Sequence, residues 1–250
     1  MVNKEKLNFD SFPLVKMWFR TFLVVDFFIE EILNVPTSYI SELLLNKYHF
    51  NKIDNIYFKG NSDSLIYLCA HIDTFNKKLY GNLEDEIYPL DIIVDENKIY
   101  LNEKRRVVLG GDDRCGVYIL LELLEYSDNF FFFMVDNEEI GESRRINIFD
   151  KKMFDGKIII TVDTISNILI PHKYDDNFLK LLKYFFPDFK IVGKRENRFS
   201  ILDYIKSDFK GFNIGCGFYN EHTNKEYILF DQVLNTLNLL KRFILSFKNV

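Results

Sequence analysis

Residues 64–73, Ser-Leu-Ile-Tyr-Leu-Cys-Ala-His-Ile-Asp, run from an apolar segment directly into a histidine and an aspartate. Residues 130–139, Phe-Phe-Phe-Phe-Met-Val-Asp-Asn-Glu-Glu, repeat this arrangement, with three acidic residues after the apolar run. Continuous apolar runs of this length are typical of buried parallel strands. Open α/β sheets place their chemistry just beyond the carboxyl ends of such strands. The sequence therefore predicts an α/β fold whose polar residues converge at one edge of a sheet.

The remaining segments fit the same α/β pattern. Short apolar runs predict further strands at residues 53–58, 157–162 and 212–217, and a hairpin at residues 91–101. Apolar residues at helical spacing predict helices at residues 15–33, 38–47, 113–126, 177–186 and 231–247. The longest stretches without a clear pattern are residues 76–89 and 190–210.

Length and composition favour a single enzyme-sized domain. With 250 residues and 48% hydrophobic content, the chain is long enough to bury a full core as one large α/β domain or as two smaller ones. We expect one domain over residues 1–250, with three αβα layers and a mixed, mainly parallel central sheet. The chain carries 37 acidic and 32 basic residues, a net charge of −5, and no dominant basic block. This balance argues against a nucleic-acid-binding surface and suits cation binding.

The cysteines and the N-terminal segment bear on cellular location. The three cysteines are odd in number and widely spaced, at Cys69, Cys115 and Cys216. A disulfide framework is therefore not expected, and the pattern is typical of a reduced, cytoplasmic protein. The first ten residues are too polar for a signal peptide, and charged residues interrupt the apolar segment 18–33. No membrane span is predicted.

Each polar motif has a structural explanation when taken alone. A single buried histidine such as His71 is more often a core residue than a ligand, and an acidic pair such as Glu138-Glu139 usually faces water. Asp112-Asp113 precedes a predicted helix and suits its N-cap and first turn. The order of the motifs is more informative than any one of them. Along the chain come His-x-Asp (71–73), Gly-x-Asp-Asp-x-x-Gly (110–116), Glu-Glu-x-Gly (138–141), Asp163 after an apolar run, and Asn-x-His-x-x-x-Glu (220–226).

In this order, from about residue 29 to 247, the motifs resemble those of the zinc-dependent exopeptidases with co-catalytic metals. This superfamily includes bacterial leucyl-type aminopeptidases, tripeptidase-like enzymes and tetrahedral aminopeptidases. The resemblance implies two divalent ions held by His71, Asp113, Glu139, Asp163 and His222. Asp113 would bridge both ions, and Asp112 would cap the helix or support the site. A nitrogen and oxygen ligand set without cysteine suits zinc, with cobalt or manganese as substitutes.

The resemblance also assigns the residues around the ions. Glu138 would be the general base that accepts a proton from the attacking water. Asp73 would hydrogen-bond the second ring nitrogen of His71 and fix its tautomer. A non-proline cis peptide bond is expected at Asp113-Arg114. His49 and His172 match no motif, and both are predicted to be surface or structural residues.

An aminopeptidase acting on peptides is the favoured function. The interval between Asp163 and His222 is too short for the lid domain of larger relatives, and single-domain relatives are mostly aminopeptidases. A dipeptidase or an N-acyl amino acid deacylase would use the same centre and stays an alternative. A catalytically silent member that binds metal or a partner, and a single-zinc cyclotransferase, are two further alternatives. The sequence leaves the substrate side chain, the native metal and the oligomeric state open.

Overall fold

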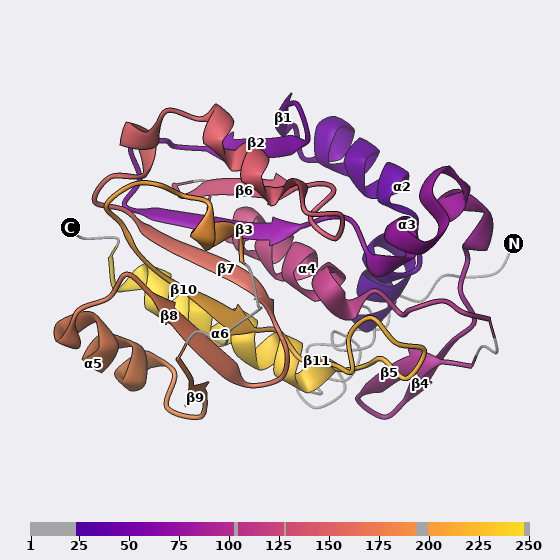
Figure 1. Cartoon of the computed structure of the whole chain (residues 1–250). Helices are drawn as coiled ribbons and strands as arrows, with labels where there is room; N and C mark the ends of the chain where they lie inside the picture. Colours follow the sequence, from indigo (N-terminus) through magenta and orange to yellow (C-terminus); the bar gives the residue numbers. More distant parts are fainter. Residues whose placement is uncertain (1–23, 103–104, 128, 194–199, 248–250) are drawn as a thin grey trace, which may run out of the picture.

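The computed structural model describes residues 24–102, 105–127, 129–193 and 200–247 (Figure 1). Its centre is an eight-stranded sheet with the order β1-β2-β6-β3-β7-β10-β8-β9. The strands are β1 (Asn51–Ile53), β2 (Ile56–Gly60), β3 (Ile66–His71), β6 (Phe131–Val135), β7 (Ile158–Thr164), β8 (Ile168–His172), β9 (Lys190–Ile191) and β10 (Lys210–Gly215). Strands β6, β3, β7 and β10 run parallel, whereas β2 and β8 pair antiparallel with their neighbours β6 and β10. The predicted mixed, mainly parallel sheet is confirmed.

Two cores lie on opposite faces of this sheet, because successive side chains of a strand point to opposite sides. On one face, Leu68, Met134 and Ile160 belong to a large core that also contains residues of the long helices α4 and α6. On the other face, Tyr67 and Phe133 belong to a smaller core closed by short 3-10 helices. The helices are α4 (Gly111–Tyr126), α5 (Asp176–Phe185), α6 (Phe230–Leu245), η5 (Glu142–Ile148), η6 (Lys151–Phe154) and η7 (Ile201–Asp203). The three layers are therefore present, with 3-10 turns in place of long helices on the second face.

The chain before the sheet is helical. The predicted helix at residues 15–33 falls partly outside the described residues, and from residue 24 onward the backbone is helical. The elements here are η2 (Phe28–Leu33), α2 (Thr37–Glu42) and η3 (Leu43–Lys47). Phe28 and Leu44 of this segment are fully buried in the large core. Among the described residues, no helix is both long and apolar enough to cross a membrane.

A second, smaller sheet lies beside the amino end of α4. It has the antiparallel order β11-β12-β5-β4, and it contains the predicted hairpin of residues 91–101. Its strands are β4 (Ile92–Asp95), β5 (Lys98–Leu101), β11 (Phe218–Tyr219) and β12 (Tyr227–Leu229). The stretch 76–89, which shows no clear pattern in the sequence, is occupied by α3 (Phe75–Tyr80) and η4 (Gly81–Ile87). Strand β12 thus carries a late segment of the chain back to an early hairpin.

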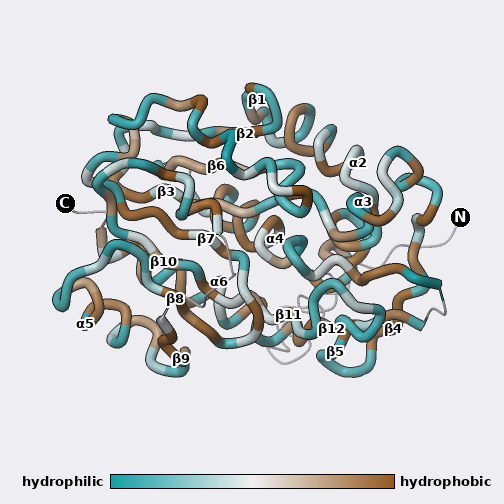
Figure 2. The backbone as a smooth tube through the Cα atoms, viewed as in Figure 1, coloured by the Kyte–Doolittle hydropathy of each residue, from teal (hydrophilic) through white to brown (hydrophobic). Residues whose placement is uncertain are grey.

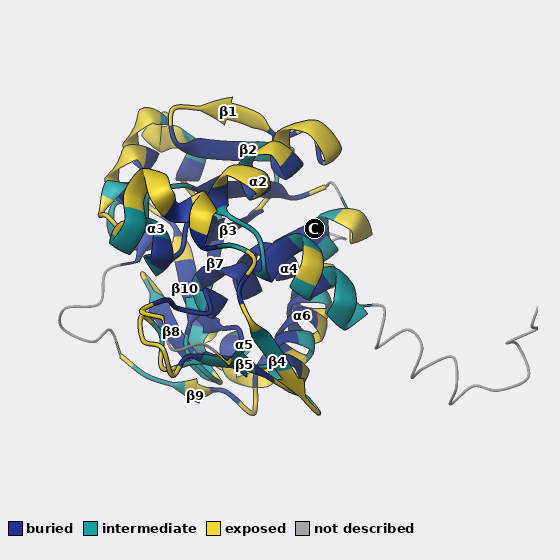
Figure 3. Cartoon of the chain, turned by 90° about the vertical axis from the view of Figure 1, so that its right-hand side faces the viewer, coloured by how far each residue is buried: buried dark blue, intermediate teal, exposed yellow. Residues whose placement is uncertain are grey.

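The described residues between 164 and 221, which exclude 194–199, build no lid. Strands β8, β9 and β10 join the central sheet, and Phe185 of α5 packs edge-on against Phe243 of α6 at 5.3 Å. Figure 2 shows apolar residues along much of the central strands. Figure 3 shows the same strands buried, with exposed residues at the outer turns. The interval is therefore part of the same layered domain.

Candidate metal centre

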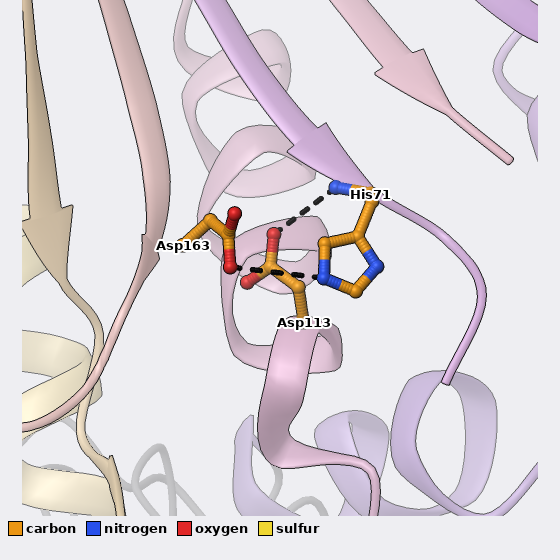
Figure 4. A group of neighbouring side chains, drawn as sticks. All are labelled: His71, Asp113 and Asp163. Carbon is orange, nitrogen blue, oxygen red and sulfur yellow. Dashed lines mark hydrogen bonds and ion pairs between the residues drawn. The ribbon is translucent and has the colours of Figure 1, made fainter. Parts of the chain in front are cut away.

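The sheet topology brings the predicted polar segments to one edge. Strand β3 ends at His71, which pairs with Val135 at the end of β6. On the other side of β3, Cys69 pairs with Thr161 of β7, so Asp163 lies two residues further along, beside His71. Because β6, β3 and β7 are parallel neighbours, their carboxyl ends meet there. The amino end of α4 points into the same region (Figure 4).

His71 is the buried anchor of this cluster. Its Nε2 lies 3.0 Å from Oδ1 of Asp112 and 3.7 Å from Oδ1 of Asp163. Its Nδ1 lies 2.9 Å from the backbone oxygen of Asp73 and 3.4 Å from the Asp73 carboxylate. One ring nitrogen therefore faces the carboxylates of the centre. The nearest partner of the other is the backbone oxygen of Asp73, whereas the resemblance implies the Asp73 side chain.

His222 completes the cluster from the other end of the chain. Its Nε2 lies 2.8 Å from Oε1 of Glu139 and 3.2 Å from Oδ2 of Asp112. The ring stacks on Phe75 with a centroid distance of 4.5 Å. The two oxygens of Asp112 thus face one histidine each. Two groups of potential metal ligands have all their donor atoms within 4.8 Å of one another: His71, Asp112 and Glu139, and His71, Asp113 and Asp163.

Asp112 and Asp113 differ from the sequence-based expectation. Asp113 is fully buried, and its carboxylate accepts hydrogen bonds from the backbone N–H groups of Gly116 (3.0 Å) and His71 (3.1 Å). The bond from an N–H three residues later is the N-cap interaction that the sequence predicts for Asp112. Asp112 instead lies between the two histidines. The expected cis peptide at Asp113-Arg114 is wrong by one residue, because the cis bond joins Asp112 to Asp113.

Asp73 fixes the turn that carries both glutamates. Its side chain is 1% exposed, and its two oxygens accept from the N–H groups of Glu138 (3.0 Å) and Glu139 (3.1 Å). The two glutamate side chains then diverge. Glu139 reaches His222, whereas Glu138 accepts a hydrogen bond from the Ser143 hydroxyl at 3.3 Å. Glu138 also lines a small cavity together with His71 and Asp163.

Glu226 is a site residue without a predicted role. It is 1% exposed, and its carboxylate accepts hydrogen bonds from the N–H groups of Gly110 (2.9 Å) and Asp112 (3.1 Å). These bonds hold the turn that presents Asp112 to the histidines. The sequence contains the signal, because Glu226 is the last residue of the Asn-x-His-x-x-x-Glu motif. His49 and His172 lie apart from the centre: His49 is exposed, and Nδ1 of His172 is 3.7 Å from Asp203.

The charges of the cluster are arranged to receive cations. Burial raises the pKa of Asp163 to about 8, and it raises the pKa of Asp113 well above its ordinary value. Burial opposes the charge of both histidines, but the neighbouring carboxylates outweigh it and raise the pKa of His222 to about 10. In addition, Oε1 of buried Glu139 receives no well-oriented hydrogen bond. Several buried carboxylates lie close together beside histidine nitrogens, and their negative charges are costly without a bound proton or cation. Such a group fits a divalent metal site.

No family model matches this chain, and no curated protein matches its sequence. Among solved structures, the aminopeptidase PepT from Bacillus cereus aligns with a TM-score of 0.64 at 10% identity, over 88% of this chain and 97% of that chain. A tripeptidase from Staphylococcus aureus aligns with a TM-score of 0.61 at 12% identity, over 88% and 96%.

The likeness extends to an archaeal enzyme. An aminopeptidase from Desulfurococcus kamchatkensis aligns with a TM-score of 0.56 at 13% identity, over 91% of this chain and 98% of that chain. This chain has the fold of these peptidases. Identities this low establish the fold alone, so an activity has to be argued from the residues of the centre.

Proposed function

We propose that this chain is a metal-dependent exopeptidase, and specifically an aminopeptidase with two divalent ions at the edge of the central sheet. One observation carries the proposal: the two oxygens of Asp112 face His71 and His222, which are far apart in sequence. A single carboxylate between two histidines suits a pair of ions, because each ion would have its own nitrogen ligand and both would share the carboxylate. The peptidase fold supports this reading.

The two ligand sets follow from the distances. His71 and Asp163 would hold one ion, His222 and Glu139 the other, and Asp112 would bridge them in place of the expected Asp113. Histidine and carboxylate ligands suit zinc, and cobalt or manganese would substitute. When bound, such ions polarise a scissile carbonyl and lower the pKa of a coordinated water.

Glu138 would move the proton. Glu138 lines the same small cavity as His71 and Asp163, so it would lie beside the ion that these two residues hold. The Ser143 hydroxyl and the backbone bond to Asp73 orient it. Glu138 would accept a proton from the attacking water and deliver it to the leaving amine.

The alternatives differ in what they require of the centre. A dipeptidase or an N-acyl amino acid deacylase would use the same residues with a different substrate. A cyclotransferase with one working zinc would need only one of the two ligand sets, and a silent binding protein would not need Glu138. Metal stoichiometry and a screen of aminoacyl, dipeptide and N-acyl substrates with zinc, cobalt or manganese separate these functions.

The roles of Glu138 and Glu139 provide the sharpest test. Glu138→Gln should keep the wild-type metal content but lose about 10²- to 10⁴-fold in turnover, because the amide does not accept the proton. Glu139→Gln should lose bound metal, and excess zinc should restore part of its turnover. Glu142→Gln is the matched control, because Glu142 lies in the same region but pairs with Arg145 at the surface. Rescue of Glu138→Gln by added metal would contradict the assignment.

A further inference from the structure

A pocket adjoins the candidate centre on the side of His222. Its volume is about 320 Å³, which is within the range of small-molecule sites. Three segments supply its walls: the start of α3, the loop that precedes α4, and the loop that follows β11. The lining residues are Phe75, Leu79, Arg105, Arg106, Val107, Val108, His222, Thr223 and Asn224.

His222 belongs to both the pocket and the centre. Its Nε2 faces Glu139 and Asp112, while its ring stacks on Phe75 with an interplanar angle of 13°. His222 therefore lies between the pocket and the other candidate metal ligands. A substrate whose scissile carbonyl lies at the centre has this pocket as an adjacent space for one of its ends.

The charge of the pocket is opposite to that of the centre. Two adjacent arginines, Arg105 and Arg106, line it, and none of the nine lining residues is acidic. Over the described part of the chain, the Arg106 guanidinium forms no ion pair, and its backbone oxygen accepts a hydrogen bond from the Tyr80 hydroxyl at 2.7 Å. Phe75 and Leu79 contribute an apolar wall, and Thr223 and Asn224 contribute polar groups. The pocket thus combines a surface for methylene groups with a guanidinium for an anion.

We propose that this pocket binds a carboxylate of the substrate, so that the enzyme prefers acidic substrates. The proposal rests on the proposed peptidase function and deepens it. Arginine recognises carboxylates through paired, charge-assisted hydrogen bonds. Two sources share this chemistry: the side chain of an N-terminal glutamate or aspartate, and the terminal carboxylate of a dipeptide. The apolar wall packs against the methylene groups that lead to the carboxylate.

Two substrate pairs that differ only in charge distinguish the sources. Glutamyl and glutaminyl p-nitroanilides test the side chain, and Leu-Gly and its C-terminal amide test the dipeptide terminus. With the full metal-loaded chain, kcat/KM should be higher for the charged member of one pair. The ratio of charged to neutral kcat/KM should fall about 10- to 100-fold in Arg106→Gln, the effect of losing a hydrogen bond between charged groups. Arg242→Gln, at an exposed arginine near the end of α6, should keep the wild-type ratio.

Two results would overturn the proposal. One is a ratio of charged to neutral kcat/KM near one for both substrate pairs. The other is a wild-type ratio in both Arg106→Gln and the double variant Arg105→Gln/Arg106→Gln. A binding measurement separates this failure from failure of the proposed function. If the pocket binds an acidic side chain, calorimetry with the metal-loaded protein should show glutamate binding about tenfold or more tightly than glutamine, with the difference lost in Arg106→Gln. If no substrate is cleaved but this difference is present, the peptidase proposal fails and the carboxylate pocket stands. Free glutamate and glutamine both carry an α-carboxylate, so equal binding excludes the acidic side chain as the ligand, and the Leu-Gly pair then decides whether the pocket binds the terminal carboxylate.

Discussion

Replacing Asp73 by asparagine should weaken both the fold and the metal centre. The Asp73 carboxylate accepts from the N–H groups of Glu138 and Glu139, and it is 1% exposed. Burial raises its pKa, but His71 and these N–H groups outweigh burial and hold the pKa below its ordinary value. The side chain is therefore ionised. Asparagine has the same shape but only one oxygen, so its amide group must face one of the two N–H donors.

The size of the effect follows from these two bonds. Hydrogen bonds to charged groups contribute about 1.5–3 kcal/mol, and a buried N–H left without an acceptor costs about 1–3 kcal/mol. Since asparagine keeps one bond, we expect the free energy of unfolding to fall by about 2–4 kcal/mol. For a chain of this length, that lowers the melting temperature by roughly 5–15 °C. Metal affinity should fall about 10- to 100-fold, because His71 loses part of its support.

Thermal unfolding in the presence of a chelator measures the change in stability. Zinc titration of the purified variant measures the change in metal affinity. Asp150→Asn is the matched control. Asp150 is an exposed N-cap, its carboxylate accepts from Lys152 N–H at 3.0 Å, and asparagine caps helices equally well. Its stability should stay within about 0.5 kcal/mol of wild type. If Asp73→Asn is as stable as this control and binds zinc like the wild type, the positioning role of Asp73 is wrong.

Two further predictions concern packing and protonation. Gly116→Ala should lower the free energy of unfolding by about 1–3 kcal/mol in chemical denaturation, because its Cβ would lie 2.2 Å from the Val162 oxygen. Gly193→Ala is the control and should not change the stability, because the space around Gly193 is open. Equal stabilities of the two variants would contradict the close packing at Gly116. In the metal-free protein, burial raises the pKa of Asp163 and of Glu226 to about 8, so the folded state binds these protons more tightly than the unfolded state. The melting temperature in chelator should therefore fall as the pH rises from about 5 to 8, and a rise over this interval would exclude the predicted protonation.

The central strands of the sheet were predictable from local sequence, whereas β8 and β9 were not predicted. The runs before His71 and at residues 130–135 are continuously apolar, and both form fully buried strands. The hairpin at residues 91–101 was equally clear, because two alternating segments flank a short polar turn. Its membership of a second sheet was not predictable, since its partner β12 follows about 130 residues later. Pairings between distant segments leave no local pattern in either strand.

The candidate site was predictable as a set of motifs but not in its finer geometry. His71 and Asp163 lie where the strand ends place them. The choice between Asp112 and Asp113 depends on which carboxylate caps α4, and adjacent aspartates suit that role equally well in sequence. Glu226 was visible as the last residue of the Asn-x-His-x-x-x-Glu motif, but its role was not, because its carboxylate accepts from the N–H group of Asp112, 114 positions earlier. Arg106 likewise gains its significance only from the pocket that it lines.

The order of the strands also governs when the centre comes into existence. Strand β3 lies between β6 and β7, and His222 follows all three strands in the chain. Synthesis proceeds from the N-terminus at about 5–20 residues per second, so a growing chain carries His71 for several seconds before His222 emerges. A nascent chain that ends before His222 therefore lacks the second histidine. The candidate centre can form only once synthesis has passed His222.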